Sequence, residues 1–303
     1  PFSEKLTQQS VTQSFQDSRG VLWFATQEGL NKYNGQKLEH FRYSLTNPIS
    51  ISSDLISGIT EDRSGNVWIA TIGGGLNKYD PIKNGFSTIF ASPSESNSLF
   101  SDDVYSIFAS RSGRIWIGYE NAFSSLDTMT GEFRHYLPDS ETIPYLGQVR
   151  DFDETDDGIM WAATLSGGLV RINEANNSIT VIKSDIDDPN SIVSDNIKSL
   201  LVDTNDKIWV ATSDSGISVY NPITNSAQNF SHNPQNNSSI SSNKTYDILK
   251  DREDRIWIAT HEGLSLFLDG SNTFERYSTH NSDIQDDRIY SIYQSLEGKY
   301  WVG

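Results

Sequence analysis

Cysteine is absent from this 303-residue sequence, which excludes disulfides, thiol nucleophiles and thiolate metal sites. Histidine does not suggest a metal site either, because the five histidines show no metal-ligand spacing. No run approaches the roughly 18 consecutive apolar residues of a membrane span. The first nine residues lack the basic and apolar regions of a signal peptide. We therefore expect no metal and no cofactor, and we expect any membrane segment to lie outside this chain.

Positive charge is also scarce. The chain has 40 acidic and 23 basic residues, which gives a formal net charge of -17. Nucleic acids and anionic membranes need clustered Lys and Arg, so neither is expected to be the main partner. A polyanionic substrate would be repelled as well, unless basic residues gather locally. The simplest interpretation of the charge is an acidic, solvated surface.

Tryptophan, in contrast, recurs at a regular interval of 44 to 48 residues. Around the second copy, residues 56–90 read as four short strands joined by turns, with a tight hairpin over 62–66. A glycine or an aspartate, both of which tolerate positive φ, stands three residues before every tryptophan. The seven tryptophans are Trp23, Trp68, Trp116, Trp161, Trp209, Trp257 and Trp301.

This repeat predicts an all-β fold, since no segment shows helical periodicity and radially stacked blades protect their strand edges. We predict one domain over residues 1–303: a seven-bladed β-propeller with four-stranded antiparallel blades and each tryptophan in the core between blades. The seventh blade is incomplete, with only its first two strands present. The alternative is six full blades plus an extra hairpin. Apolar residues three apart, such as Leu30 and Tyr33, predict a bulge or a twist in the third strand of a blade.

The wording of the repeat resembles a known family. Asp-Arg-Ser-Gly-Asn-Val-Trp-Ile-Ala-Thr at 62–71, similar segments at 17–26 and 251–260, and the linker at 232–243 resemble the two-component regulator propeller repeat. The resemblance implies the periplasmic sensor region of a membrane-spanning bacterial receptor, either a hybrid histidine kinase or a diguanylate cyclase with a GGDEF output domain. It also implies that this chain is a fragment of a larger homodimeric receptor, whose kinase or cyclase activity and membrane attachment lie in other segments.

Fourteen residues before each tryptophan, the chain enters the innermost strand of a blade. Four of these positions hold Asp, which predicts a ring of carboxylates at the mouth of the propeller channel. Such a ring could bind a cation or accept hydrogen bonds from sugar hydroxyls, although calcium needs about six to eight converging oxygens. The alternative is turn capping. The ring consists of Asp54, Asp102, Asp195, Asn243 and Asp287, with Gln9 and Gly147 in the other copies.

The third repeat departs most from the pattern, and such residues have the least structural reason to be there. It replaces the usual Thr and Gly with the segment 119–123, and a nearby loop leading into an inner strand carries Tyr145. A mixed polar and aromatic cluster on one face fits ligand binding better than catalysis; sequence drift is the alternative. The predicted ligand-binding residues are Tyr119, Glu120, Asn121, Phe123 and Tyr145, with Gln27, Glu28, Asp214, His261 and Glu262 in equivalent loops.

The function that we expect is non-catalytic sensing of a small molecule outside the cytoplasm, with signalling through altered dimer contacts. An oligosaccharide ligand is suggested by analogy with part of the family. A propeller-type polysaccharide lyase or glycan hydrolase is one alternative, which would need an acid and a base such as Glu120, His261 or Glu262 to converge. A protein-interaction scaffold is the other alternative.

Overall fold

The computed structural model describes residues 6–8, 10–137, 145–176 and 178–303. The chain forms two compact units, Pro1–Leu137 (unit 1) and Pro138–Gly303 (unit 2). Every regular element of the described residues is a β-strand, which confirms the predicted all-β class. None of these residues belongs to a helix that could cross a membrane.

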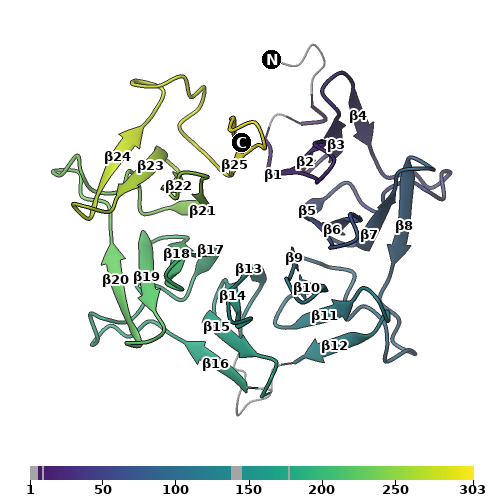
Figure 1. Cartoon of the computed structure of the whole chain (residues 1–303), viewed down its shortest axis with the longest axis horizontal. Helices are drawn as coiled ribbons and strands as arrows, with labels where there is room; N and C mark the ends of the chain where they lie inside the picture. Colours follow the sequence, from purple (N-terminus) through teal and green to yellow (C-terminus); the bar gives the residue numbers. More distant parts are fainter. Residues whose placement is uncertain (1–5, 9, 138–144, 177) are drawn as a thin grey trace. The chain divides into compact units, whose positions relative to one another are not determined.

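Among its described residues, unit 1 contains three four-stranded antiparallel sheets, each with its strands in chain order. The first strands of the sheets lie along one edge of the unit and the last strands along the opposite edge (Figure 1). The strands are β1 (Gln13–Gln16), β2 (Leu22–Thr26), β3 (Gly29–Tyr33) and β4 (Leu38–Phe41); β5 (Ile56–Glu61), β6 (Val67–Thr71), β7 (Gly75–Asp80) and β8 (Gly85–Ile89); and β9 (Ser106–Ala109), β10 (Arg114–Gly118), β11 (Phe123–Asp127) and β12 (Phe133–Tyr136).

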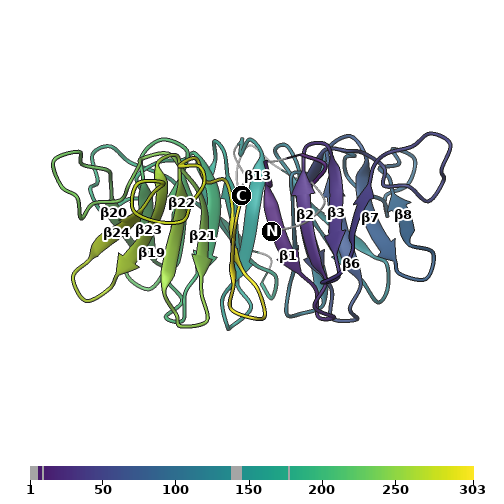
Figure 2. The same ribbon diagram turned by 90° about the horizontal axis from the view of Figure 1, so that it is seen from above.

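The described part of unit 2 contains three further sheets of the same kind and one two-stranded hairpin. Neighbouring strands such as β21, β22 and β23 stand side by side (Figure 2). The strands are β13 (Val149–Glu154), β14 (Met160–Thr164), β15 (Gly168–Asn173) and β16 (Ser178–Ile182); β17 (Ile197–Val202), β18 (Ile208–Thr212), β19 (Ile217–Asn221) and β20 (Ser226–Phe230); β21 (Thr245–Lys250), β22 (Ile256–Thr260), β23 (Gly263–Leu268) and β24 (Thr273–Tyr277); and the hairpin β25 (Ile292–Gln294) and β26 (Tyr300–Val302).

The six four-stranded sheets are blades of a β-propeller, so the predicted blade type is confirmed. A seventh blade is not confirmed. Over the described residues the seventh repeat forms only the hairpin of β25 and β26, in agreement with the expectation that just two of its strands are present. The prediction that residues 1–303 constitute a single domain stays a prediction.

The hairpin that precedes each tryptophan strand takes the predicted backbone conformation. The residue three positions before the tryptophan has a positive φ in all seven repeats, whether it is glycine or aspartate. Aspartate tolerates this region better than most residues because its short polar side chain can hydrogen-bond locally. These residues are Gly20, Gly65, Gly113, Gly158, Asp206, Asp254 and Gly298.

The bulge predicted for the third strand is in fact found in the first strand. The third strands pair with their neighbours without a register shift. Leu30 is fully buried, whereas Tyr33 is partly exposed and donates its hydroxyl to the carbonyl of Gly35, so the apolar spacing does not mark a single buried face. Register shifts instead occur in β5, β13, β17 and β21.

Five of the seven tryptophans lie in the core between successive sheets of their own unit, as predicted: Trp23, Trp68, Trp161, Trp209 and Trp257. Trp116 is buried as well and stacks on Tyr136 of its own sheet. Trp23 has no exposed surface and packs with Ile56, Ile59 and Tyr79 of the following sheet. Its ring lies 4.9 Å from that of Tyr79, edge to face. Trp301 is only partly buried.

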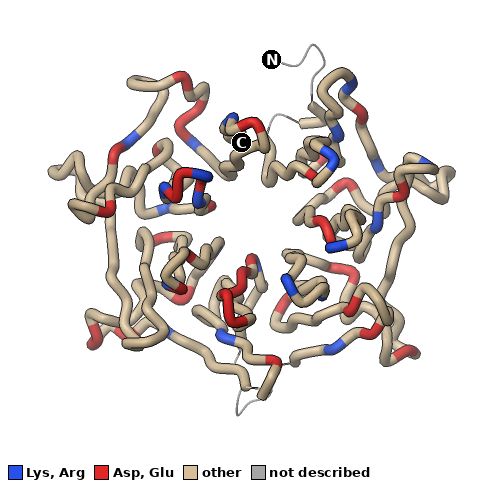
Figure 3. The backbone as a smooth tube through the Cα atoms, in the orientation of Figure 1, with Lys and Arg blue, Asp and Glu red and all other residues tan. Residues whose placement is uncertain are grey.

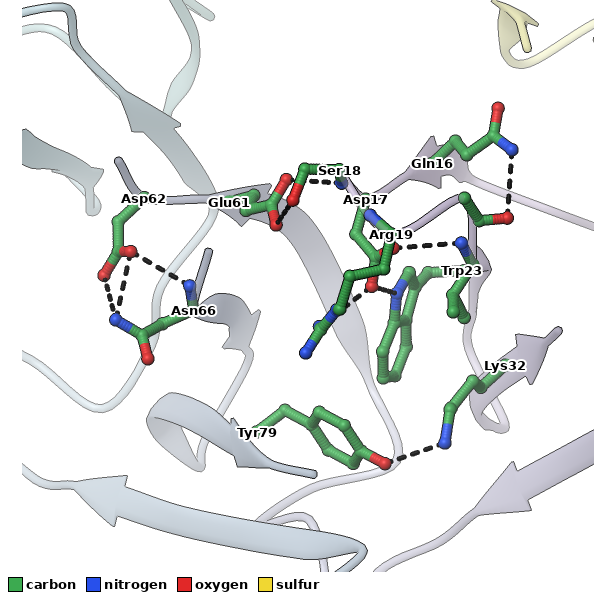
Figure 4. Close-up of polar contacts among 12 residues, drawn as sticks. Gln16, Asp17, Ser18, Arg19, Trp23, Lys32, Glu61, Asp62, Asn66 and Tyr79 are labelled. Atoms are coloured by element: carbon green, nitrogen blue, oxygen red, sulfur yellow. Dashed lines mark hydrogen bonds and ion pairs between the residues drawn. The ribbon is translucent and has the colours of Figure 1, made fainter. Parts of the chain in front are cut away.

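Four of the tryptophans share an acceptor, buried in three cases and partly buried in the fourth, that the repeat pattern had not revealed. An aspartate six residues earlier accepts the indole N–H with one carboxylate oxygen, as Asp17 does for Trp23 at 3.2 Å (Figure 4). Its other oxygen accepts backbone amides of the hairpin, such as that of Val21. The same pair joins Asp62 to Trp68, Asp203 to Trp209 and Asp251 to Trp257. The aspartate therefore fixes the hairpin and the tryptophan together.

Replacing Asp251 with asparagine is expected to lower the free energy of unfolding by about 1–3 kcal/mol at pH 7, because the amide cannot accept all the donors that converge there. Burial alone would raise the pKa of Asp251, but hydrogen bonds from Tyr300, Trp257 and Arg255 outweigh it and lower the pKa to about 2. A lowered folded-state pKa stabilises above the unfolded pKa, so the effect should fade as the pH falls from about 4 towards 2. Urea unfolding at several pH values measures it. Glu253→Gln, an exposed neighbour, is the control, and equal losses in both variants would contradict the prediction.

Candidate functional site

The register shifts of the first strands give four residues an unusual position. Ser57, Arg150, Lys198 and Tyr246 are each the extra residue of a β-bulge, eleven residues before the tryptophan of the repeat. A bulge leaves its extra residue out of the ladder and re-aims the side chain. Tyr290 holds the same position before β25. The backbone amides of Tyr290 and Ser291 both donate to the carbonyl of Gly303. Unit 2 thus carries four such side chains in succession.

In unit 2 these side chains form a continuous set of contacts. The Lys198 ammonium lies 4.8 Å from the ring centroid of Tyr246, and the Tyr246 and Tyr290 rings are 5.0 Å apart. The Tyr246 hydroxyl and His261 Nδ1 are hydrogen-bonded at 3.1 Å. The neighbouring Tyr290 side chain raises the pKa of Arg288. We name this set the unit 2 bulge cluster; it consists of Arg150, Lys198, Tyr246, His261, Arg288 and Tyr290.

The cluster is cationic in a strongly acidic protein. Within each unit, acidic and basic positions are interspersed along the chain (Figure 3). Burial and then the charge of Arg150 lower the pKa of Lys198. No Asp or Glu of the described residues forms an ion pair with Lys198. Burial, followed by the neighbouring Tyr290, raises the pKa of Tyr246. Cations and aromatic rings in this arrangement suit an anionic group attached to a flat ring.

Next to the cluster, the first strands of unit 2 are joined by two carboxylates and one hydroxyl. Ser199 Oγ lies 2.8 Å from Asp151 Oδ2 and 3.3 Å from Asp247 Oδ1. Asp151 Oδ2 also accepts the amide of Leu200, and Asp247 Oδ2 accepts that of Ile292, so each aspartate reaches the following first strand. A single hydroxyl proton faces two carboxyl groups, which favours protonation of one of them.

The free energy of unfolding should therefore fall as the pH rises from about 4 through 7, and Asp247→Asn should flatten this slope. Burial, with the nearby charges of Asp247 and Asp153, raises the pKa of Asp151 to about 7, and burial raises that of Asp247 to about 6. A raised folded-state pKa stabilises below the unfolded pKa, and this contribution is lost as the pH passes the folded pKa. Urea unfolding between pH 4 and 8 measures the slope. Asp283→Asn, on an exposed residue, serves as the control; an unchanged slope in Asp247→Asn would contradict the prediction.

The third-repeat residues are divided by the structure. Tyr119 and Phe123 have no exposed surface, and Phe123 stacks on Tyr136 at 5.0 Å, so the prediction that these two contact a ligand is corrected: they are core residues. The amide of Tyr119 donates to the carbonyl of Ala122, and Asn121 has a φ of 57°. The segment is thus a tight turn whose aromatic side chains point into the core. Glu120 and Tyr145 are exposed, and their proposed role stays a prediction.

Of the other predicted ligand-binding residues, only His261 joins the unit 2 bulge cluster. Glu262 is exposed, and its charge acts on Arg276. Asp214 accepts hydrogen bonds from Ser215 and Asn196; although burial alone would raise its pKa, these bonds lower it. In unit 1, Gln27 and Glu28 lie in an exposed turn, where Glu28 pairs with Arg42 at 3.5 Å. Ligand contact by these residues remains untested.

The side chains of the predicted ring of carboxylates accept hydrogen bonds from the backbone of their own linkers. The side-chain Oδ1 atom of each ring residue accepts a backbone amide from the linker that precedes the residue, at 2.6–2.7 Å. The backbone carbonyl of the same residue accepts the amide of a glycine, which lies at the start of the third strand of the preceding sheet or just before it. The turn-capping alternative therefore explains Asp54, Asp102, Asp195, Asn243 and Asp287. Gln9 lies outside the described residues. No three His, Asp or Glu side chains of the described residues are placed to hold a metal ion.

Sequence reasoning missed Arg150, Lys198, Tyr246 and Tyr290, although a signal was present. When the repeats are aligned on tryptophan, position -11 holds small or polar residues in the first two repeats and large residues from the third onward, beginning with Tyr105; cations occur there only in the fourth and fifth repeats. The same alignment places Asp151 and Asp247 at position -10, where the other repeats have Gln, Gly or Ser. A departure in residue size and charge at one position thus marks the cluster.

Comparison with known proteins agrees with this architecture. The family model described as two component regulator propeller matches residues 50–73, 98–121 and 239–262. The match confirms the resemblance predicted from the wording of the repeat. The chain is built of β-propeller blades, and three of its segments match the two component regulator propeller repeat. No curated protein sequence matches it significantly.

Among solved structures, the chain is similar to the extracellular domain of a protein described as a hybrid two component system, BT3049 from B. thetaiotaomicron. The identity is 26% and the TM-score 0.81, over 97% of this chain and 38% of that one. PorZ, a surface component of the type-IX secretion system of Porphyromonas gingivalis, matches at 15% identity and a TM-score of 0.76, over 100% of this chain and 46% of PorZ. Virginiamycin B lyase from Staphylococcus aureus matches at 16% identity and a TM-score of 0.67, over 99% of this chain and 94% of the lyase. These last two likenesses show the fold alone.

Proposed function

We propose that this chain is a ligand-sensing propeller in the extracytoplasmic region of a bacterial transmembrane signalling receptor of the hybrid two-component type, and that it binds its ligand without transforming it. The likeness to the BT3049 extracellular domain and the regulator propeller repeats support this proposal. The chain spans 38% of that domain, so the membrane attachment, the periplasmic location, the dimer and the kinase or cyclase output all belong to the proposal.

The unit 2 bulge cluster is the observation that carries the sensing role. At three successive repeats the large side chains of Lys198, Tyr246 and Tyr290 contact one another, and aromatic and cationic groups of this kind hold ligands in protein sites. Acid–base catalysis would need a donor and an acceptor aimed at one substrate bond. The His261 ring is hydrogen-bonded to Tyr246, and no hydrogen bond between His261 and Glu262 occurs among the described residues, which favours binding over turnover.

A bound ligand could alter the receptor only if it prefers one arrangement of the structure to another. The cluster spans β13, β17, β21 and the segment before β25, whose neighbouring members are in contact. A ligand that bridges these strands would therefore favour one spacing between them. This change in spacing is the step that we propose the receptor passes on to its dimer contacts.

The test uses the purified chain and a panel of oligosaccharides, followed by thermal shift, calorimetry and product analysis. Sensing predicts saturable binding without products, and Tyr246→Leu should abolish the binding while leaving the melting temperature of the free chain within a few degrees. Turnover that is lost in His261→Ala would overturn the proposal in favour of a lyase or hydrolase. A stoichiometric protein partner in a pull-down, without any small-molecule shift, would favour a scaffold.

A further inference from the structure

The cluster has a polarity opposite to that of the protein around it. The chain carries a formal net charge of -17, yet Arg150 and Lys198 occupy equivalent bulge positions on the adjacent strands β13 and β17. The two charges are close enough for Arg150 to disfavour the charged form of Lys198. Placing like charges together costs free energy unless another group compensates for them. No carboxylate of the described residues pairs with Lys198, so the described part of the chain provides no ion pair for the Lys198 ammonium.

An aromatic surface adjoins these cations. The Lys198 ammonium lies over the Tyr246 ring, 4.8 Å from its centroid. The Tyr290 ring packs next to the Tyr246 ring, and the two ring planes are inclined at 48°. Tyr290 is 38% exposed, so part of its ring is accessible. The His261 ring and the Tyr246 hydroxyl are polar groups at the edge of this surface. A ring-shaped molecule could therefore lie on the tyrosines with a polar substituent towards Lys198.

Unit 1 provides an internal comparison. Its one described residue at a register shift, Ser57, is small and uses its hydroxyl to hydrogen-bond the carbonyl of Val104 at 2.5 Å, whereas Tyr105 before β9 is aromatic. The bulge itself is therefore compatible with a purely structural role. The long cationic and aromatic residues at the equivalent positions of unit 2 are not needed to form it.

We propose that the unit 2 bulge cluster binds the anionic group of a small ring-bearing ligand, a carboxylate or sulfate held by Lys198 and Arg150 while the ring lies on Tyr246 and Tyr290. Charge-assisted hydrogen bonds to the anion would compensate the Lys198 ammonium, and the tyrosine faces would bury one face of the ring. This inference rests on the proposed sensing function and specifies the ligand class. It also explains how a protein with so negative a charge could bind an anion: the binding groups are gathered at one place.

The test compares charged and neutral versions of one ring by calorimetry with the whole chain. The probes are glucuronate against glucose, N-acetylglucosamine 6-sulfate against N-acetylglucosamine, and sulfate ion alone. At least one anionic sugar should bind about tenfold or more tightly than its neutral counterpart and than sulfate, since a hydrogen bond to a charged group contributes about that factor. Comparing the affinities for glucuronate and for N-acetylglucosamine 6-sulfate then identifies whether a carboxylate or a sulfate is preferred. Added salt should weaken the binding.

Lys198→Met should reduce the affinity for the preferred anionic sugar about tenfold, because it removes the charge and keeps the length of the side chain. Lys207→Met is the matched control. It removes one exposed lysine from the hairpin at the opposite end of the same strand, β17, and should leave the affinity unchanged. Both variants should retain the melting temperature of the parent chain. An equal effect of the two variants, or none from Lys198→Met, would overturn the proposal.

Two outcomes separate this inference from the sensing function. If neutral sugars bind as tightly as anionic ones, or if no anionic sugar binds, the assignment of an anionic ligand is wrong, whereas sensing of another ligand stands. If an anionic sugar binds through Lys198 but does not alter the output of the full receptor in cells, the site is correct and the sensing function is wrong.

Discussion

Trp23→Ala is expected to lower the free energy of unfolding by about 3–5 kcal/mol, the usual cost of removing a large buried aromatic side chain. The indole has no exposed surface and fills the space between two sheets of unit 1, against Ile59 and Tyr79. Its loss leaves a cavity and also leaves Asp17, itself fully buried, without the indole donor. Proteins are stable by only about 5–15 kcal/mol, so the change removes a large share of the total. Urea unfolding followed by circular dichroism measures it.

Two further variants separate packing from the hydrogen bond. Trp23→Phe keeps an aromatic ring but has no N–H group for Asp17, and it should cost less than Trp23→Ala. The double variant Trp23→Ala with Asp17→Ala should cost less than the sum of the single changes, because the two residues contact each other. Strict additivity would contradict the proposed coupling between Trp23 and Asp17, and a loss below about 1 kcal/mol in Trp23→Ala would show that the tryptophan is not the core residue described here.

Gly263→Ala is expected to lower the free energy of unfolding by about 3 kcal/mol, of which about 1–2 kcal/mol comes from the left-handed backbone and the rest from overlap. Gly263 begins β23 with a φ of 94°. A Cβ atom there would overlap the carbonyl oxygen of Tyr277, which belongs to the neighbouring strand. The amide of Gly263 also donates to the carbonyl of Asp287, so the backbone cannot easily move away.

Two other glycines of unit 2 divide this cost into its parts. Gly158 has a φ of 82°, and a Cβ atom added there would meet no atom within 4 Å, so Gly158→Ala should show only the backbone cost of about 1–2 kcal/mol. Gly270 has neither constraint, and Gly270→Ala should leave the stability almost unchanged. Chemical unfolding of the three variants gives the comparison. Equal effects at Gly158 and Gly263 would mean that the overlap with Tyr277 is relieved at little cost.

The blade could be predicted from sequence because its constraints are local. The tryptophan strand, the hairpin before it and the positive φ at residues such as Gly65 or Asp254 all depend on neighbours within a few residues. Each is also repeated seven times, which makes a pattern visible. The partner of the indole was missed because its aspartate was assigned only to the turn. Asp62, for example, serves the hairpin with one oxygen and Trp68 with the other.

The candidate site was predicted less well because its side chains come from different repeats. His261 was identified from its loop, but its partner Tyr246 lies on a strand whose bulge breaks the expected alternation. Tyr119 was misassigned because an unusual residue was taken as a functional one. Its aromatic ring instead fills the core of its own unit, and burial raises its pKa. Rarity within a repeat therefore indicates a change in packing as readily as a change in function.

The capping contacts between successive sheets have a consequence for how such chains can change in length. Each linker residue such as Asp195 ties the sheet that follows it to the glycine at the third strand of the sheet before it, here Gly168. We call this pair of hydrogen bonds, one to the linker residue's side chain and one to its backbone carbonyl, the clasp. Both bonds recur at five of the junctions between repeats. Duplicating or excising one whole repeat that carries them would consequently recreate the same clasp at the new junction, without any compensating substitution. Genetic recombination in units of one repeat would then yield foldable chains far more often than recombination at other points.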